Sequence, residues 1–115
     1  MALSKKPKLK MFCTQGETFR HTFYFQDEYG NYADLTGFTA RMEIRSSDDD
    51  LLIRLETGDG ITIEGKKMTV EIDATTTAGF ATATYSYEPE LIAPSGDVIK
   101  YFAPSPFVVL PEVTL

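Results

Sequence analysis

The stretch "FTARMEIR" (Phe38–Arg45) decides the fold class, because apolar and polar residues alternate along its whole length. Its apolar residues share one parity along the chain: Phe38, Ala40, Met42 and Ile44. Successive side chains of a β-strand point to opposite faces of the sheet. The period of two therefore predicts a strand with one packed face and one charged face.

Short segments on both sides repeat this alternation and are separated by turn-forming clusters such as "QDEYGN" and "SSDDD". The shared parity predicts a core of Phe19, Phe23, Phe25, Phe38, Met42, Ile44, Leu55, Ile63, Val70, Ile72 and Tyr85. By the same rule Leu51 faces inward. "ATTTAGF" breaks the pattern and predicts either one helical turn or a crossover. Proline cannot donate to a sheet ladder, so Pro104, Pro106 and Pro111 predict an edge strand or irregular structure in the tail.

Many short strands separated at regular intervals by turn clusters are typical of β-sandwiches and barrels. We expect an all-β fold, specifically a mainly antiparallel immunoglobulin-like β-sandwich of about eight short strands with a basic, extended N-terminal arm. A small closed barrel is the main alternative. The expected division is an arm over residues 1–12 and a single sandwich domain over residues 13–115.

The composition argues against catalytic and metal chemistry. The 115 residues contain one cysteine and one histidine, so an intrachain disulfide, most His/Cys metal sites and a Cys-His nucleophile pair are not expected. No apolar run approaches the roughly 20 residues of a membrane-spanning helix, and we expect no membrane insertion. We predict no catalytic residues, no metal site and no cofactor.

Four local features could carry chemistry, and each has a simpler structural interpretation. His21 shares the parity of Phe19 and Phe23, so we expect it in or beside the core. Asp48–Asp50 lacks the ligand spacing of a calcium loop and predicts a solvated turn. Gly58–Gly60 is interpreted as a turn, and Cys13 as a small buried hydrophobe.

Charge is unevenly distributed along the chain. The first ten residues contain four lysines and no acidic residue: Lys5, Lys6, Lys8 and Lys10. All 17 acidic residues lie in the remainder of the chain. An acidic body argues against nucleic-acid binding. We expect the extended arm to reach a neighbouring molecule and add a strand to its sheet edge. The predicted partner-binding residues are Lys5, Lys6, Lys8, Leu9, Lys10 and Met11.

The order of the turn motifs resembles that of a family of small bacteriophage virion structural proteins with an immunoglobulin-like β-sandwich. The resemblance covers roughly residues 15–115 and is carried by Gly16–Phe19, Asp27–Asn31, Asp34–Gly37, Ile44–Arg45, Gly60–Ile63 and Pro111–Thr114. It implies a non-enzymatic virion protein that binds major capsid or tail proteins, as a capsid decoration or cement protein or as a tail-tip or fibre adaptor.

Assembly in many copies would suit such a role, so we expect a homo-oligomer, with a trimer favoured. The alternative function is a glycan-binding accessory module of a phage particle. Carbohydrate sites use exposed aromatic rings, and this chain has no tryptophan. Tyr24, Tyr29 and Tyr32 are the available substitutes.

Overall fold

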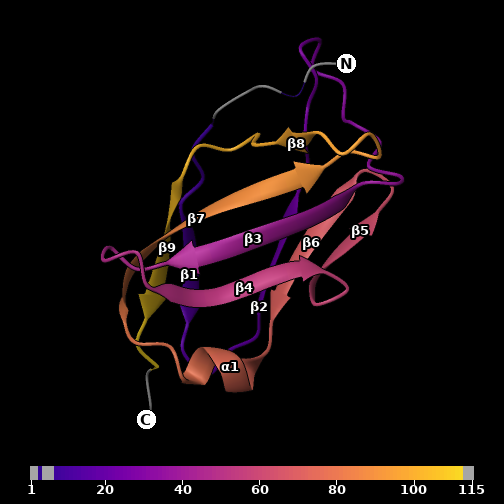
Figure 1. The fold of residues 1–115 in the computed structure, drawn as a ribbon. Helices are drawn as coiled ribbons and strands as arrows, with labels where there is room; N and C mark the ends of the chain where they lie inside the picture. The colour runs from indigo at the N-terminus through magenta and orange to yellow at the C-terminus, as the bar shows by residue number, and fades with distance from the viewer. Residues whose placement is uncertain (1–2, 4–6, 113–115) are drawn as a thin grey trace.

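The computed structural model describes residue 3 and residues 7–112, which form nine strands and one short helix (Figure 1). The elements are β1 (Met11–Thr14), β2 (Phe19–Phe23), β3 (Thr39–Arg45), β4 (Leu51–Thr57), β5 (Gly60–Glu64), β6 (Lys67–Ile72), α1 (Ala74–Ala78), β7 (Ala83–Ile92), β8 (Val98–Ile99) and β9 (Ser105–Leu110).

All these strands belong to one sheet. Its path is β1-β9-β7-β3-β4-β5-β6-β2, and β8 pairs with β7 beside the path. Pairing is antiparallel except between β1 and β9 and between β4 and β5. The two ends of the path, β1 and β2, are consecutive in the chain, so the sheet curls almost into a closed barrel. The predicted all-β, mainly antiparallel class is confirmed.

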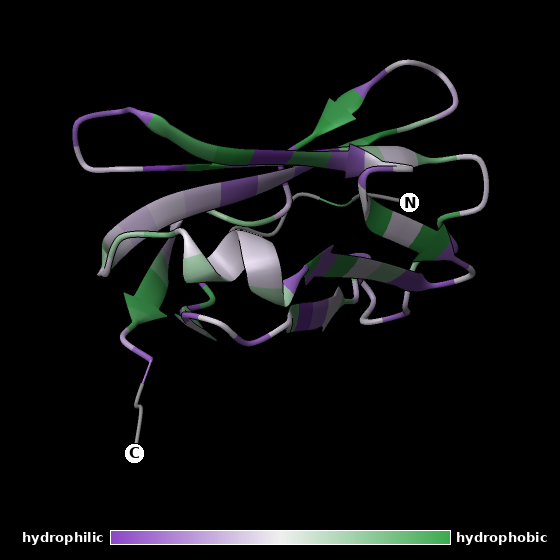
Figure 2. Cartoon of the chain, turned by 90° about the horizontal axis from the view of Figure 1, so that it is seen from below, coloured by the Kyte–Doolittle hydropathy of each residue, from purple (hydrophilic) through white to green (hydrophobic). Residues whose placement is uncertain are grey.

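The sheet folds over at the corner between β4 and β5. Only two residue pairs join these strands, Glu56 with Gly60 and Thr57 with Ile61. Strands β3, β4 and β7 therefore cross in front of β2 and β6 (Figure 1). Figure 2 shows hydrophobic and hydrophilic residues alternating along several of the strands, as the period of two requires.

The space between the two layers is filled by the predicted core. Of the predicted residues, nine are buried: Phe19, Phe23, Phe25, Met42, Ile44, Leu55, Val70, Ile72 and Tyr85. Phe38 and Ile63 are partly buried and pack against the same cluster. The inward faces read from parity are thus confirmed for these core residues.

Aromatic rings form the centre of this core and join β2 to the opposite layer. Phe23 lies 5.2 Å from Phe102 and 6.3 Å from Tyr87, measured between ring centroids. Phe19 meets Phe107 edge-on at 5.2 Å. Such edge-to-face pairs add about 0.5–1.5 kcal/mol each beyond the area they bury.

Leu51 does not face inward as predicted, because a bulge interrupts β4. Ile44 pairs with Ile53, but the next residue, Arg45, pairs with Leu51. The extra residue, Leu52, shifts the alternation by one and turns Leu51 outward, where it is 49% exposed. Parity read from sequence cannot detect an inserted residue that the partner strand lacks.

The proline-rich tail was predicted as an edge strand or as irregular structure. Pro104 and Pro111 do lie in irregular structure, but Pro106 lies in a strand that is not at an edge. Strand β9 lies between β1 and β7. Pro106 pairs with Ser86 of β7, whereas β1 pairs with β9 only from Phe107 onward. Pro106, which has no N–H, therefore lies one residue before the part of β9 that pairs with β1, and no hydrogen bond of the β1–β9 ladder requires its N–H.

The described part of the N-terminal arm packs on its own domain. Ala103 N donates to Pro7 O at 3.0 Å, Leu9 N donates to the Ser105 hydroxyl at 3.1 Å, and the Tyr87 hydroxyl donates to Leu9 O. Met11 is buried in β1. The expectation that Leu9 and Met11 lie along a neighbour's edge is therefore corrected, since both contact their own core. Lys5 and Lys6 lie outside the described residues.

Replacing Gly60 by alanine should destabilise the β4–β5 corner. Gly60 has a φ of +94°, and a Cβ there would lie 2.5 Å from the Leu55 Cδ2 atom. Gly58 has a similar φ of +88° but open space around it. Both substitutions carry the cost of a positive φ, so chemical denaturation should show a larger loss of unfolding free energy for Gly60→Ala than for Gly58→Ala. Equal losses would contradict the packing account of this corner.

Tyr87→Phe should loosen the arm. It leaves the Leu9 carbonyl without its donor, which should lower the unfolding free energy by about 1–2 kcal/mol. Hydrogen exchange at the Leu9 and Ala103 amides should accelerate. Tyr85→Phe is the matched control, because the Tyr85 hydroxyl donates to Ala81 O, four residues away. Unchanged exchange at Leu9 in Tyr87→Phe would show that the arm is held by other contacts.

Candidate functional site

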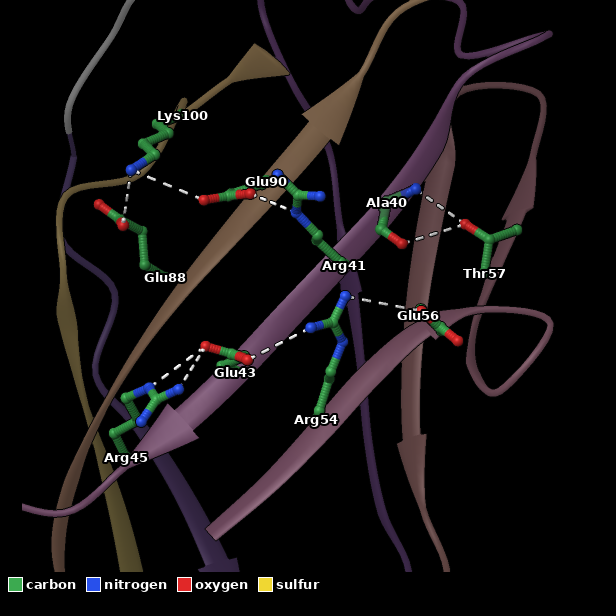
Figure 3. A network of polar contacts seen from close by, with 10 residues as sticks. All are labelled: Ala40, Arg41, Glu43, Arg45, Arg54, Glu56, Thr57, Glu88, Glu90 and Lys100. Atoms are coloured by element: carbon green, nitrogen blue, oxygen red, sulfur yellow. Dashed lines mark hydrogen bonds and ion pairs between the residues drawn. The ribbon is translucent and has the colours of Figure 1, made fainter. Parts of the chain in front are cut away.

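The outer face of β7, β3 and β4 carries a network of ion pairs over a groove of about 450 Å³. Figure 3 shows Glu43 of β3 between Arg45 and Arg54, and Arg41 beside Glu90 of β7. The Glu43 carboxylate lies 2.9 Å from Arg45 Nη2 and 3.5 Å from Arg54 Nη1. Alternation places these side chains outward, as the charged parity of "FTARMEIR" predicts.

Lys100 completes the network from the segment between β8 and β9. Its Nζ lies 3.6 Å from both Glu88 Oε1 and Glu90 Oε1. Strand β9 pairs with residues 83–87 of β7 and β8 with residues 91–92, so neither pairs with Glu88, Pro89 or Glu90. Exposed ion pairs contribute about 0–1 kcal/mol each. Both signs of charge are interspersed across this face, and it offers no reactive group or single-sign ligand site.

A second surface is the loop between β2 and β3, which projects at the top of Figure 1. We define the tyrosine turn as residues 24–32. Three of its side chains are exposed: Tyr24 to 44%, Tyr29 to 81% and Tyr32 to 53%. The rings of Tyr24 and Tyr32 lie 5.5 Å apart.

Hydrogen bonds hold the tyrosine turn in one conformation. The buried Asp27 carboxylate accepts from the backbone N–H of Tyr29 and of Asn31, at 2.9 and 3.0 Å. Asp27 N donates to Asn31 O, and Gly30 supplies a φ of +84°. Burial raises the pKa of Asp27, but the hydrogen bonds from Asn31 and Tyr29 favour the ionised carboxylate and together bring this pKa below its ordinary value. The turn therefore presents its tyrosines on a rigid support.

The residues singled out from sequence are not brought together as a catalytic site. Cys13 is buried, and this burial, together with the nearby Glu17 charge, raises the pKa of its thiol, so the unreactive neutral form dominates. His21 is half-buried, with its ring 4.5 Å from that of Phe23. Asp48–Asp50 form a solvated turn in which the Ser46 hydroxyl accepts from the Asp48 and Asp50 amides.

Within the part of the chain that the structure describes, no group of three or more His, Cys, Asp or Glu residues is arranged to hold a metal ion. Among the same residues, no helix has the length and apolar character needed to cross a bilayer.

Comparison with known proteins gives a fold and no family. No protein-family model and no curated protein matches the chain. One solved structure with a similar fold is the crystal structure of CopC from Methylosinus trichosporium OB3b, at a TM-score of 0.50 and 14% identity. The match covers 97% of this chain and 90% of that chain. An identity this low shows the fold alone.

This comparison contradicts the bacteriophage function expected from the order of the turn motifs. A solved structure that shares the fold is a CopC and not a virion protein. Turn motifs are mostly local backbone chemistry, so their order does not by itself specify a function. The virion role, in both its structural and its glycan-binding form, is not retained. The predicted homo-oligomer and the partner-binding role of Lys8 and Lys10 stay predictions.

Burial of His21 makes the fold sensitive to mild acid. Desolvation favours the neutral ring and lowers the pKa of His21 from its ordinary 6.5. The unfolded chain then binds a proton more readily than the folded chain, so stability is complete above about pH 6.5 and falls as the pH drops toward the folded-state pKa. Denaturation measured from about pH 7.5 to about pH 5 should show this loss. His21→Gln should remove the slope across that window, and a slope that persists would assign it to other groups.

Proposed function

We propose that this chain is a non-enzymatic module that recognises a partner protein through the tyrosine turn. The observation that carries the proposal is the group of three exposed tyrosines, Tyr24, Tyr29 and Tyr32, on one rigid turn. Exposed aromatic side chains are costly to leave in water and are typical of contact surfaces.

Tyrosine suits a protein interface for physical reasons. It supplies a large contact area with two side-chain torsions to immobilise, and its hydroxyl still forms hydrogen bonds. Tyrosine is accordingly enriched among the residues that dominate binding energy. Because the turn is already ordered by Asp27 and Gly30, binding loses little backbone entropy.

Charge indicates the kind of partner. The chain has a formal net charge of −6, and Glu28 lies inside the turn. Complementary charge steers association and raises the rate of encounter. We therefore propose a partner protein with a basic surface around an apolar contact patch.

We also propose that the fold is an immunoglobulin-like sandwich. Immunoglobulin-like sandwiches display binding loops at the ends of their layers. The tyrosine turn lies in the connection from β2 in one layer to β3 in the other, and this position supports that classification for this chain.

Site-specific photocrosslinking would test the proposed function. A photoreactive phenylalanine in place of the exposed Glu28 should link the partner in cells that produce this protein, and the partner is then purified. In binding assays with that partner, the double variant Tyr29→Ala, Tyr32→Ala should weaken affinity about thirtyfold, the effect of a hot-spot pair worth about 2 kcal/mol.

Leu51→Ala is the matched control, because Leu51 is comparably exposed but lies on β4. It should change affinity by less than about twofold. Affinity should also fall as salt is raised, since the proposed partner is basic. Equal affinity of the wild-type chain and the double tyrosine variant would overturn the proposal.

A further inference from the structure

The sheet has an opening between its two end strands. We define the β1–β2 seam as the groove between β1 and β2, which is lined by residues 10–14 and 17–21 and has a volume of about 380 Å³. These strands are consecutive in the chain, yet in the described residues β1 pairs with β9 and β2 pairs with β6, and the two do not pair with each other. Each presents one free edge to the groove.

The turn that joins the two strands is held in place from outside the seam. Gln15 N donates to Leu110 O at 3.0 Å, and the Gln15 side-chain amide donates to Phe80 O at 2.6 Å. Gly16 N donates to the Thr77 hydroxyl at 3.1 Å, and that hydroxyl donates to Glu17 O at 2.8 Å. Helix α1 and β9 therefore fix the turn, and the two free edges are held as a preformed opening.

The side chains of the seam have two kinds of chemistry. Met11, Cys13 and Phe19 are buried and form an apolar floor. Outward-facing residues form the rim. Lys10 directly precedes β1, Phe12 lies in β1, and Arg20 lies in β2. Phe12 is 56% exposed, with the Lys10 ammonium 5.3 Å from its ring centroid. A phenylalanine exposed on a free edge is a liability for aggregation unless something covers it.

Charge distinguishes this groove from the rest of an acidic chain. Lys10 and Arg20 stand on its two sides, and Glu17 lies at the end closed by the turn. A carboxylate placed between the two strands away from the turn would meet a cation from each side. The exposed ion pair of Arg20 with Glu71 is weak enough to be exchanged for such a contact.

We propose that the β1–β2 seam binds an extended segment of a partner protein as an added strand that closes the barrel. The segment alternates apolar and acidic residues. Its apolar side chains enter over Met11, Cys13 and Phe19, and its carboxylates lie between Lys10 and Arg20. Backbone hydrogen bonds to both free edges supply affinity, and the alternating side chains supply specificity.

The length of the edges sets the length of the segment. Strand β1 has four residues and β2 has five, so the added strand spans four to five residues. This site is separate from the tyrosine turn, which extends beyond the other end of β2. Failure of one proposal therefore leaves the other standing.

The probe is a short synthetic peptide that alternates valine and glutamate, compared with one that alternates valine and lysine. The glutamate peptide should bind saturably and slow hydrogen exchange at amides within residues 10–14 and 19–23. Lys10→Glu should weaken its binding about tenfold and strengthen that of the lysine peptide. Lys67→Glu, an equal charge reversal on an exposed residue outside the groove, should change neither by more than about twofold.

Both variants should melt near the wild-type temperature, since both side chains are exposed. A peptide with alternate backbone nitrogens methylated should not bind, because it cannot donate to an edge. The proposal is overturned if no saturable binding occurs, if exchange slows elsewhere, or if Lys10→Glu and Lys67→Glu behave alike. If exchange at the seam amides slows when the protein concentration is raised without peptide, and added peptide does not reverse this, the occupant is a second copy of this chain. That result would also overturn the proposal.

Discussion

Aromatic packing between β2 and the opposite layer is the interaction on which the rest of this structure depends. The ends of the sheet are not joined by a hydrogen-bonded ladder, so side chains must hold β2 against β7 and β9. Phe19 and Phe23 do so through Phe107, Tyr87 and Phe102. Their large apolar area supplies the stabilisation that a closed barrel would also draw from backbone pairing.

That arrangement determines where the molecule is able to bind. The layers are fixed by the core, and the free edges of β1 and β2 are left with their donors and acceptors facing a groove. At the far end of β2, the chain leaves the core after Phe25 and turns outward around Asp27. Strand β2 therefore contributes to two different surfaces. Near the turn after β1 it presents a free backbone edge, and at its other end it leads into the loop that carries the tyrosines.

The charged face of β3, β4 and β7 is best explained by solubility and register. Its ion pairs join neighbouring strands, as Glu43 joins Arg54 across β3 and β4. Opposite charges across strands favour the observed register, and a mixed-sign surface resists association with other sheets. The larger of the two grooves described above therefore lies over a surface without a chemical specialisation, whereas the β1–β2 seam has an apolar floor and unpaired backbone.

The sequence by itself determined the β class, the inward face of most strands and the core residues, because alternation fixes which side chains share a face. It also placed charged residues outward on β3 and tyrosines beside a turn. Only the tertiary structure decided that Leu51 faces outward, because a bulge depends on the partner strand. Only the tertiary structure likewise showed that β9 is an inner strand and that the described part of the arm packs on its own domain. The residue pattern of a strand does not indicate which segment it pairs with. Likewise the seam exists only because β1 and β2, adjacent in sequence, pair with different strands, a choice made by the packing of the two layers.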